Sequence, residues 1–150
     1  MSTNRINNGH FNDKNIKFWH PSRDSVWVPT FHERSPDDWA LEMVTGEPIV
    51  QYLPFGSYSG TIVLSADLRS SSGEAMVILS VLGVTDDGIE TQIFQYMIGT
   101  EWETCTFKTK LPLPYNNPSL SIAAINLETL RTGKIGFPTY VDNVQLYSDV

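Results

Sequence analysis

The sequence has one cysteine in 150 residues, Cys105, which excludes an internal disulfide framework. Cys105 lies in the strand-like stretch 104–107 (TCTF), where a lone cysteine is more typical of a small buried residue than of a nucleophile. Three histidines, His10, His20 and His32, are too widely spaced to supply the short ligand pairs of a zinc site. We therefore expect satisfied histidines in loops or strands rather than metal ligands.

Basic residues are also few. Lys and Arg number 10 against 17 Asp and Glu, which gives a formal net charge of −7, and the basic residues are scattered along the chain. Without a Lys/Arg stripe to neutralise phosphates, we expect no binding to nucleic acid or to an anionic membrane. No run reaches the ~18 apolar residues of a membrane span, and residues 1–5 (MSTNR) lack the apolar run of a signal peptide. These absences predict synthesis in the cytoplasm.

Catalytic motifs are missing as well. The sequence contains no Gly-x-Ser-x-Gly element, no phosphate loop and no Cys/His spacing typical of a nucleophile and its base. Seventeen acidic residues always furnish candidate carboxylate pairs, but most glutamates lie in expected turns or on polar strand faces. A glycan-active enzyme is therefore the third interpretation of function, behind two non-catalytic ones.

What the sequence does contain is strand signals. Ile62 to Arg69 alternates apolar and polar residues, as a half-buried antiparallel strand does. Ala75 to Leu82 is apolar almost throughout, which indicates a strand buried on both sides. The turn residues 86–88 (DDG) then lead into a partner strand from Ile89 to Met97.

The remaining expected strands are short and separated by turn residues. They cover 6–11, 26–33, 39–44, 49–55, 103–110, 120–127 and 136–147, and prolines 112, 114 and 118 mark a long loop. The total is about nine or ten strands, with no convincing helix, no internal repeat and no linker. The pattern predicts one all-β domain over residues 1–150, an antiparallel β-sandwich jelly roll.

The two ends of the chain carry a resemblance to a known family. Residues 5–11 (RINNGHF) with Phe18-Trp19 fit an N-x-x-x-N-G-x-F…W opening, and residues 140–146 (YVDNVQL) fit a [YF]-[VI]-D-[DN]-V-x-L ending. Internal elements agree in order: 49–54 (IVQYLP), 64–69 (LSADLR) before Gly73, and Trp102 with Phe107, one residue short of the usual spacing. Together they resemble the β-jelly-roll carbohydrate-binding modules of families four, nine and twenty-two, in the galactose-binding-like superfamily.

The resemblance implies a sugar site on a concave sheet face or at a loop edge. Aromatic faces pack on sugar C–H groups while planar polar side chains reach hydroxyls, so our candidates are Trp27, Arg69, Gln92 and Tyr96. The alternative is that these aromatic residues pack in the core or across strands.

The resemblance also implies a structural calcium site between the N-terminal loop and the last strand. Asp142 matches the acidic position of the closing motif, whereas Asn12 stands where the family has an acidic residue, with Asp13 next. Calcium needs several hard oxygen ligands, so the loss of one carboxylate weakens such a site. The alternative role for Asp142 is a buried carboxylate that accepts hydrogen bonds from loop amides.

Two non-catalytic functions are compatible with the resemblance, and the lack of a signal peptide together with the small, acidic, cysteine-poor single domain favours the second. One is a free-standing carbohydrate-binding module; the other, which we favour, is a structural and adhesive protein on a bacteriophage virion surface, as a head decoration or tail accessory protein. The expected partners are then a capsid or tail protein, further copies of the chain in a symmetric oligomer, and a cell-surface glycan bound with avidity from many copies.

Overall fold

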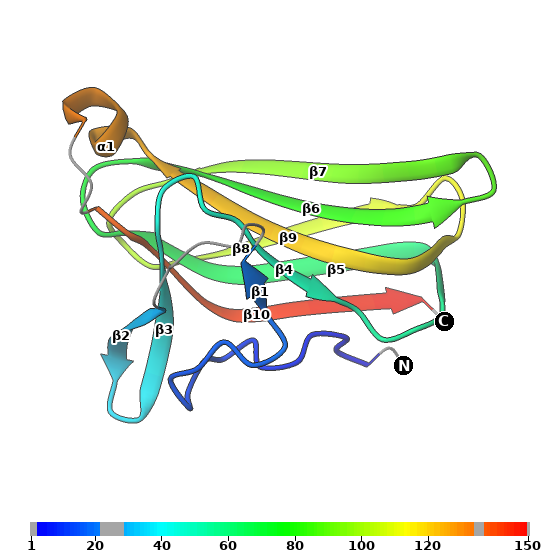
Figure 1. Ribbon diagram of the computed structural model, residues 1–150, viewed down its shortest axis with the longest axis horizontal. Coiled ribbons are helices and arrows are strands. Elements are labelled where there is room, and N and C mark those ends of the chain that lie inside the picture. The colour runs from blue at the N-terminus through cyan, green and yellow to red at the C-terminus, as the bar shows by residue number, and fades with distance from the viewer. Residues whose placement is uncertain (1–2, 22–28, 134–136, 150) are drawn as a thin grey trace.

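Two antiparallel β-sheets pack face to face in the computed structural model, which describes residues 3–21, 29–133 and 137–149 (Figure 1). Sheet A has the strand order β1 (His20–Pro21), β4 (Ile49–Tyr52), β9 (Tyr115–Asn126), β6 (Ala75–Thr85), β7 (Gly88–Ile98). Sheet B has the order β8 (Glu103–Lys110), β5 (Ser57–Ser70), β10 (Thr139–Asp149), β3 (Asp38–Met43), β2 (Thr30–Ser35). The start of β5 also pairs with β9, so the two sheets are joined along one side. The prediction of an all-β jelly-roll sandwich is confirmed.

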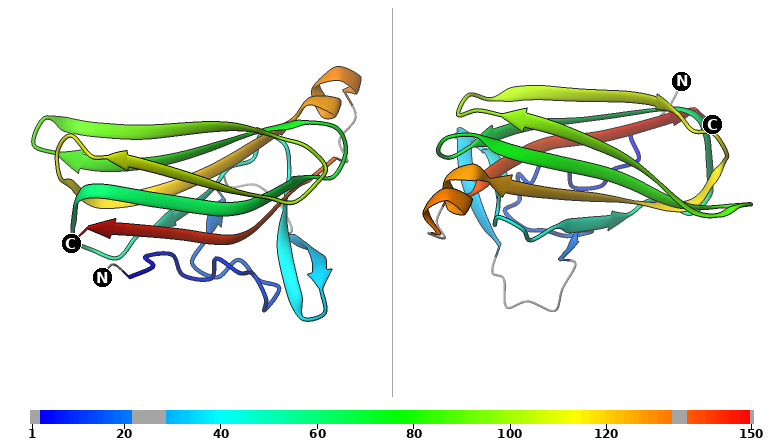
Figure 2. Two further views of the ribbon diagram at one scale, coloured as in Figure 1. Left: turned by 180° about the vertical axis from the view of Figure 1, so that it is seen from behind. Right: turned by 90° about the horizontal axis from the view of Figure 1, so that it is seen from above.

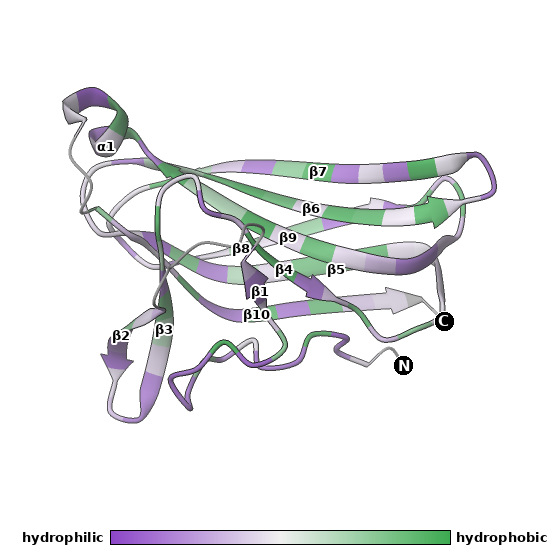
Figure 3. Cartoon of the chain, in the orientation of Figure 1, coloured by the Kyte–Doolittle hydropathy of each residue, from purple (hydrophilic) through white to green (hydrophobic). Residues whose placement is uncertain are grey.

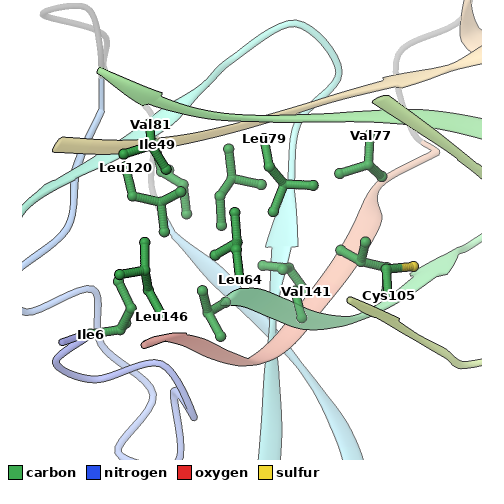
Figure 4. Packing of buried hydrophobic residues seen from close by; sticks show 14 of the residues in the cluster. Ile6, Ile49, Leu64, Val77, Leu79, Val81, Cys105, Leu120, Val141 and Leu146 are labelled. Atoms are coloured by element: carbon green, nitrogen blue, oxygen red, sulfur yellow. The ribbon is translucent and has the colours of Figure 1, made fainter. Parts of the chain in front are cut away.

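The core lies between the two sheets, and it follows from strand alternation. In β5, Ile62, Leu64 and Leu68 are buried while Val63 and Arg69 on the other face are partly exposed. Figure 4 shows such side chains from both layers meeting between the sheets, and Figure 2 shows the two layers from behind and from above. Because successive side chains of a strand point to opposite faces, the same alternation also fixes which residues line the outer faces.

The strand β6 differs from its expectation. Its residues alternate strictly between buried and partly or fully exposed, so it is buried on one face only. The prediction of a strand buried on both sides was wrong, because Leu82 and Val84 belong to the outward face of sheet A.

The N-terminal segment is not a regular strand, although residues 6–11 were expected to form one. It runs along the free edge of β10, where the Arg5 N–H donates to the Leu146 carbonyl at 2.8 Å and the Val144 N–H donates to the Gly9 carbonyl at 3.0 Å (Figure 1). A Cβ at Gly9 would lie 2.1 Å from the Val144 carbonyl oxygen. The segment therefore covers the edge that β3 leaves free after it separates from β10.

Two further expectations need correction, one at the start of β9 and one directly after its end. The expected loop around Pro118 is partly strand, since β9 already begins at Tyr115. The chain also forms a short helix, α1 (Leu127–Thr132), where no helix was expected. The Asn126 side chain accepts hydrogen bonds from the Glu128 and Thr129 N–H groups, and Gly133 ends the helix in the left-handed region. No helix within the described ranges is long and apolar enough to cross a membrane.

Candidate functional site

The outer face of sheet B gathers aromatic and charged side chains from strands that are far apart in the sequence. Tyr140 pairs with Arg69, and Asp142 pairs with Asp67, so the register of β10 on β5 places all four on one face. That face points outward because the intervening Val141 is buried in the core. We call it the platform face, and its other members are His32 and Arg34 of β2, Glu42 of β3, Trp102 before β8, and Thr104 of β8.

Arg34 is the centre of the platform face. Its Nη1 atom donates to Asp67 Oδ2 at 2.8 Å and to Asp142 Oδ2 at 3.0 Å, and its guanidinium carbon lies 4.1 Å from the centroid of the Trp102 ring. Thr104 Oγ1 donates to the second oxygen of Asp67 at 2.6 Å. Burial lowers the pKa of Arg34, but the hydrogen bonds and charges of the two carboxylates outweigh it, so the net pKa lies above the usual value. The guanidinium therefore holds Trp102 in place from a fixed, charge-paired position.

Asp142 is the most buried charged group of this cluster, with 2% of its surface exposed. Burial raises its pKa to about 6, against the opposing effects of the Arg34 hydrogen bond and of the Asn143 N–H, which donates to Asp142 Oδ1 at 2.8 Å. The nearby charge of Asp38 raises it further. At neutral pH two carboxylates thus share one guanidinium, which makes the cluster sensitive to any change at Arg34.

Three aromatic rings of the platform face contact one another, with Tyr140 as the ring that the other two share. Tyr140 stacks on His32 with centroids 4.2 Å apart and an interplanar angle of 11°, and Trp102 lies 6.4 Å from Tyr140. The guanidinium carbon of Arg69 lies 5.7 Å from the Tyr140 ring, and Arg69 Nε donates to the Thr100 carbonyl at 2.7 Å. Burial raises the pKa of Tyr140, and the charge of Glu42 raises it further while that of Arg69 lowers it.

A cavity of about 410 Å³ adjoins one end of the platform face. Thr30 and Glu42 line it and also tie it to the platform, because Thr30 Oγ1 lies 3.0 Å from Glu42 Oε2 and Glu42 pairs with Tyr140. The rest of its wall is Val44, Thr45, Glu47, Thr129, Phe137 and Pro138. Half-buried rings beside charged hydrogen-bonding groups suit a ligand with one apolar side and a polar rim.

The residues predicted from the sequence do not all come together. Arg69 lies on the platform face, whereas Gln92 and Tyr96 lie on β7 of the other sheet, and Trp27 is outside the described residues. The side chains of Gln92 and Tyr96 face the open side of the sandwich: Gln92 Nε2 lies 3.4 Å from the Tyr115 hydroxyl, and Tyr96 meets Phe107 edge-to-face with centroids 5.9 Å apart.

Sequence reasoning singled out Asp142, though as a metal ligand, but gave no binding role to the aromatic residues or to Arg34 of the platform face. Trp102 was noticed only as part of a motif, and Tyr140 only as the first residue of the closing pattern. Arg34 carried no signal, since its position opposite Asp142 comes from chain segments 108 residues apart.

The residues around Asp142 do not fit a calcium ion as they stand. Asp142 Oδ2 already accepts from a guanidinium, which brings a positive charge to the place where a cation would bind. Asn12, at the expected second ligand position, instead accepts from the Trp39 N–H at 3.0 Å. Among the described residues no group of three or more His, Cys, Asp or Glu side chains gathers to hold a metal. Calcium binding stays a prediction from the sequence.

Comparison with known proteins gives similarity at the level of structure. The sequence matches no protein-family model and no curated protein sequence. TmCBM61, solved in complex with β-1,4-galactotriose, superposes with a TM-score of 0.68 at 14% sequence identity, covering 99% of this chain and 100% of that one. The CBM22-1–GH10 modules of Clostridium thermocellum xylanase 10B, complexed with xylohexaose, superpose with a TM-score of 0.69 at 14% identity.

A third similar structure comes from a virus. The enzymatically active domain of tailspike protein 4 from bacteriophage CBA120 superposes with a TM-score of 0.67 at 12% identity. This chain is covered to 97% by the tailspike and to 99% by the xylanase, but spans only 21% and 29% of their lengths. The chain therefore has the β-jelly-roll fold of carbohydrate-binding modules.

Proposed function

We propose that this protein is a non-catalytic module that binds a glycan on the platform face. The observation that carries the proposal is the group of three aromatic rings, Trp102, Tyr140 and His32, flanked by the guanidinium groups of Arg34 and Arg69. A pyranose ring has apolar C–H faces and an equatorial rim of hydroxyls, so half-buried rings and planar charged groups complement it. The sugar ligands of TmCBM61 and of the xylanase modules support the same class of ligand.

In this mechanism the residues divide the work by chemistry. Trp102 binds a sugar face through its half-buried ring, Tyr140 borders the site in its stack on His32, and Arg69 supplies donors to hydroxyls at the rim. Arg34 acts through Trp102, because its two carboxylate partners fix it against one face of the ring. Glu42, which lines the adjoining cavity and pairs with Tyr140, offers acceptors to a sugar bound beside that ring. Nothing in this arrangement requires a bond to be broken, since Asp67 and Asp142 are committed to Arg34.

Affinity electrophoresis tests this function directly. Native gels containing soluble xylan, β-1,4-galactan, mixed-linked β-glucan or a bacterial surface polysaccharide are compared with a gel without polysaccharide. Removing a ring that covers about 80 Å² of sugar surface costs about 2 kcal/mol, or roughly 30-fold in affinity. We expect at least one polysaccharide to retard the protein and Trp102→Ala to abolish the retardation.

Trp39→Ala is the matched control. Trp39 also has a cation–π contact, since Lys14 Nζ lies 4.6 Å from the centroid of its ring, but Trp39 lies off the platform face. Retardation of Trp102→Ala equal to that of the wild type, or no retardation of the wild type by any polysaccharide, would contradict the proposed function.

A second candidate is the virion role that the sequence analysis favoured. Its supporting observation is the tailspike domain that shares the fold. We propose that the module sits on the surface of a virion, where docking to a capsid or tail protein multiplies weak glycan binding. Mass spectrometry of purified particles tests this: the protein should be present in a fixed copy number per particle, and its absence from particles would contradict the role.

A further inference from the structure

The outer face of sheet A is apolar and uncovered. Because Leu82 pairs with Thr91 and Val84 with Ile89, the outward residues of β6 and β7 form one surface. Ile89 is 71% exposed and Ile93 is 60% exposed, and Leu82, Val84 and Met97 are exposed as well. Figure 3 shows the cause in the sequence: β6 is hydrophobic along most of its length, although only one of its faces lies in the core. We call this surface the apolar face.

Charge is missing from the apolar face. The outward positions of β6, β7 and the adjoining part of β9, all within the described residues, hold only apolar side chains and neutral polar ones such as Ser80, Thr91 and Gln95. The chain as a whole has a net charge of −7, so its acidic residues lie elsewhere. A large uncharged surface on which apolar side chains predominate marks an interaction site.

The size of the apolar face matches a two-fold contact. Strands of 11 residues, as β6 and β7 are, extend about 35 Å at ~3.3 Å per residue, and three strands at ~4.8 Å spacing span about 15 Å. Each copy thus offers about 500 Å², and two copies bury about 1,000 Å², the lower limit of a specific interface.

We propose that the apolar face is the interface between two copies of this chain. Two sheets with regular rows of side chains pack face to face at about −30°, and a two-fold axis lets the same rows meet. Two copies that each carry −7 repel each other, so their contact is least costly where it brings no acidic groups close together. The apolar face is the one large outer sheet surface of the described chain that meets this condition. A charged partner protein would find no complementary charge here.

This dimer has a consequence for the platform face, which lies on the opposite side of the sandwich. Back-to-back contact through sheet A leaves both platform faces exposed and pointing away from each other. The two glycan sites then point in opposite directions, so one dimer can bind two polysaccharide chains at once, which a monomer cannot do. This consequence depends on the proposed function, whereas the dimer itself does not.

Light scattering after size exclusion of the full-length protein tests the proposal. We expect a mass of twice the 16.9 kDa chain, and we expect Ile93→Lys and Ile89→Lys to run as monomers. Both positions are mostly exposed in the single chain, so circular dichroism should show the variants folded. The matched control is Leu130→Lys on α1, which replaces an apolar side chain that is 66% exposed and should leave the dimer intact.

A monomeric wild type at all soluble concentrations would overturn the proposal. So would an oligomer that survives Ile93→Lys, or one that Leu130→Lys disrupts equally. Gel retardation distinguishes a failure of the dimer from a failure of the proposed glycan binding. A monomeric Ile93→Lys variant should still be retarded by polysaccharide, only less strongly than the dimer. Trp102→Ala should lose the retardation but stay dimeric.

Discussion

Replacing Arg34 with Met tests whether the platform face depends on one shared guanidinium. The substitution keeps an apolar stem against Trp102 but leaves Asp67 and Asp142 without their common cation. Breaking a buried ion pair by removing one partner costs about 3–5 kcal/mol. The Arg34 side chain is 24% exposed, so solvent screens part of that loss, and we expect a decrease of about 2–3 kcal/mol in the free energy of unfolding at pH 7.

The pH dependence of this loss follows from Asp142, whose pKa burial already raises to about 6. Without the guanidinium the pKa of Asp142 rises further, so at pH 5 a bound proton replaces the lost cation. The destabilisation by Arg34→Met should therefore be about 1 kcal/mol smaller at pH 5 than at pH 7, at 1.36 kcal/mol for each unit of pKa shift. Adding Asp142→Asn to Arg34→Met should recover about 1 kcal/mol or more at pH 7, because only one carboxylate then remains unpaired.

Urea denaturation of the single and double variants at the two pH values measures these differences. Arg69→Met is the matched control, since Arg69 lies on the same face but pairs with no carboxylate among the described residues, and it should cost less than about 1 kcal/mol. A loss below about 1 kcal/mol for Arg34→Met at pH 7, or an equal loss with and without Asp142→Asn, would refute the reasoning.

Three further predictions concern stability and reactivity. The folded state binds the proton of Asp142 more tightly than the unfolded state, so the contribution of Asp142 to the free energy of unfolding should fall as the pH rises from 3.8 to about 6. Asp142→Asn should flatten this slope in urea titrations. An unchanged slope would contradict the raised pKa of Asp142. Gly9→Ala should lower the free energy of unfolding by about 2 kcal/mol or more, because its Cβ would strike the Val144 carbonyl of β10. Gly99→Ala, with open space around the added Cβ, should change the thermal midpoint little. Equal effects of the two substitutions would be evidence against the close approach of Gly9 to β10. Burial, with the charges of Glu103 and Asp67, raises the pKa of the Cys105 thiol to about 11, so Ellman's reagent at pH 8 should label it only after unfolding, and rapid labelling of the folded protein would disagree with its buried position.

Much of the fold could be predicted because its signals are local. The strand β8 was expected from Glu103 to Lys110 and has these bounds, and the turn at 86–88 joins β6 to β7 as the sequence indicated. Alternation and turn chemistry act over a few residues, so one sequence suffices to read them. The same holds for the helix cap at Asn126 and Gly133, whose signal was present but overlooked because the helix is only 6 residues long.

The site was less predictable because it depends on register. Alternation showed that Asp67 and Arg69 face outward from the core, and this was correct. It did not show that β10 would set Tyr140 and Asp142 beside them, or that the β2–β3 hairpin would bring Arg34 across. Gln92 and Tyr96 share one strand face, as alternation indicated, but that face lies on the open side of the sandwich and away from the platform face, so their role in ligand binding stays a prediction. A strand's two faces can be separated from sequence, whereas which face meets solvent depends on its partners.

The most direct test of the proposed glycan site is a ¹H–¹⁵N NMR titration that follows the tryptophan indole N–H signals. The titrant is an oligosaccharide cut from the polysaccharide that retards the protein in gels. We predict that the Trp102 signal shifts in a saturable way, while Trp19, whose Nε1 donates to the Asn8 carbonyl at 3.0 Å, and Trp39 do not move. A titration that leaves Trp102 unchanged, or that shifts Trp19 or Trp39 instead, would contradict a glycan site on the platform face.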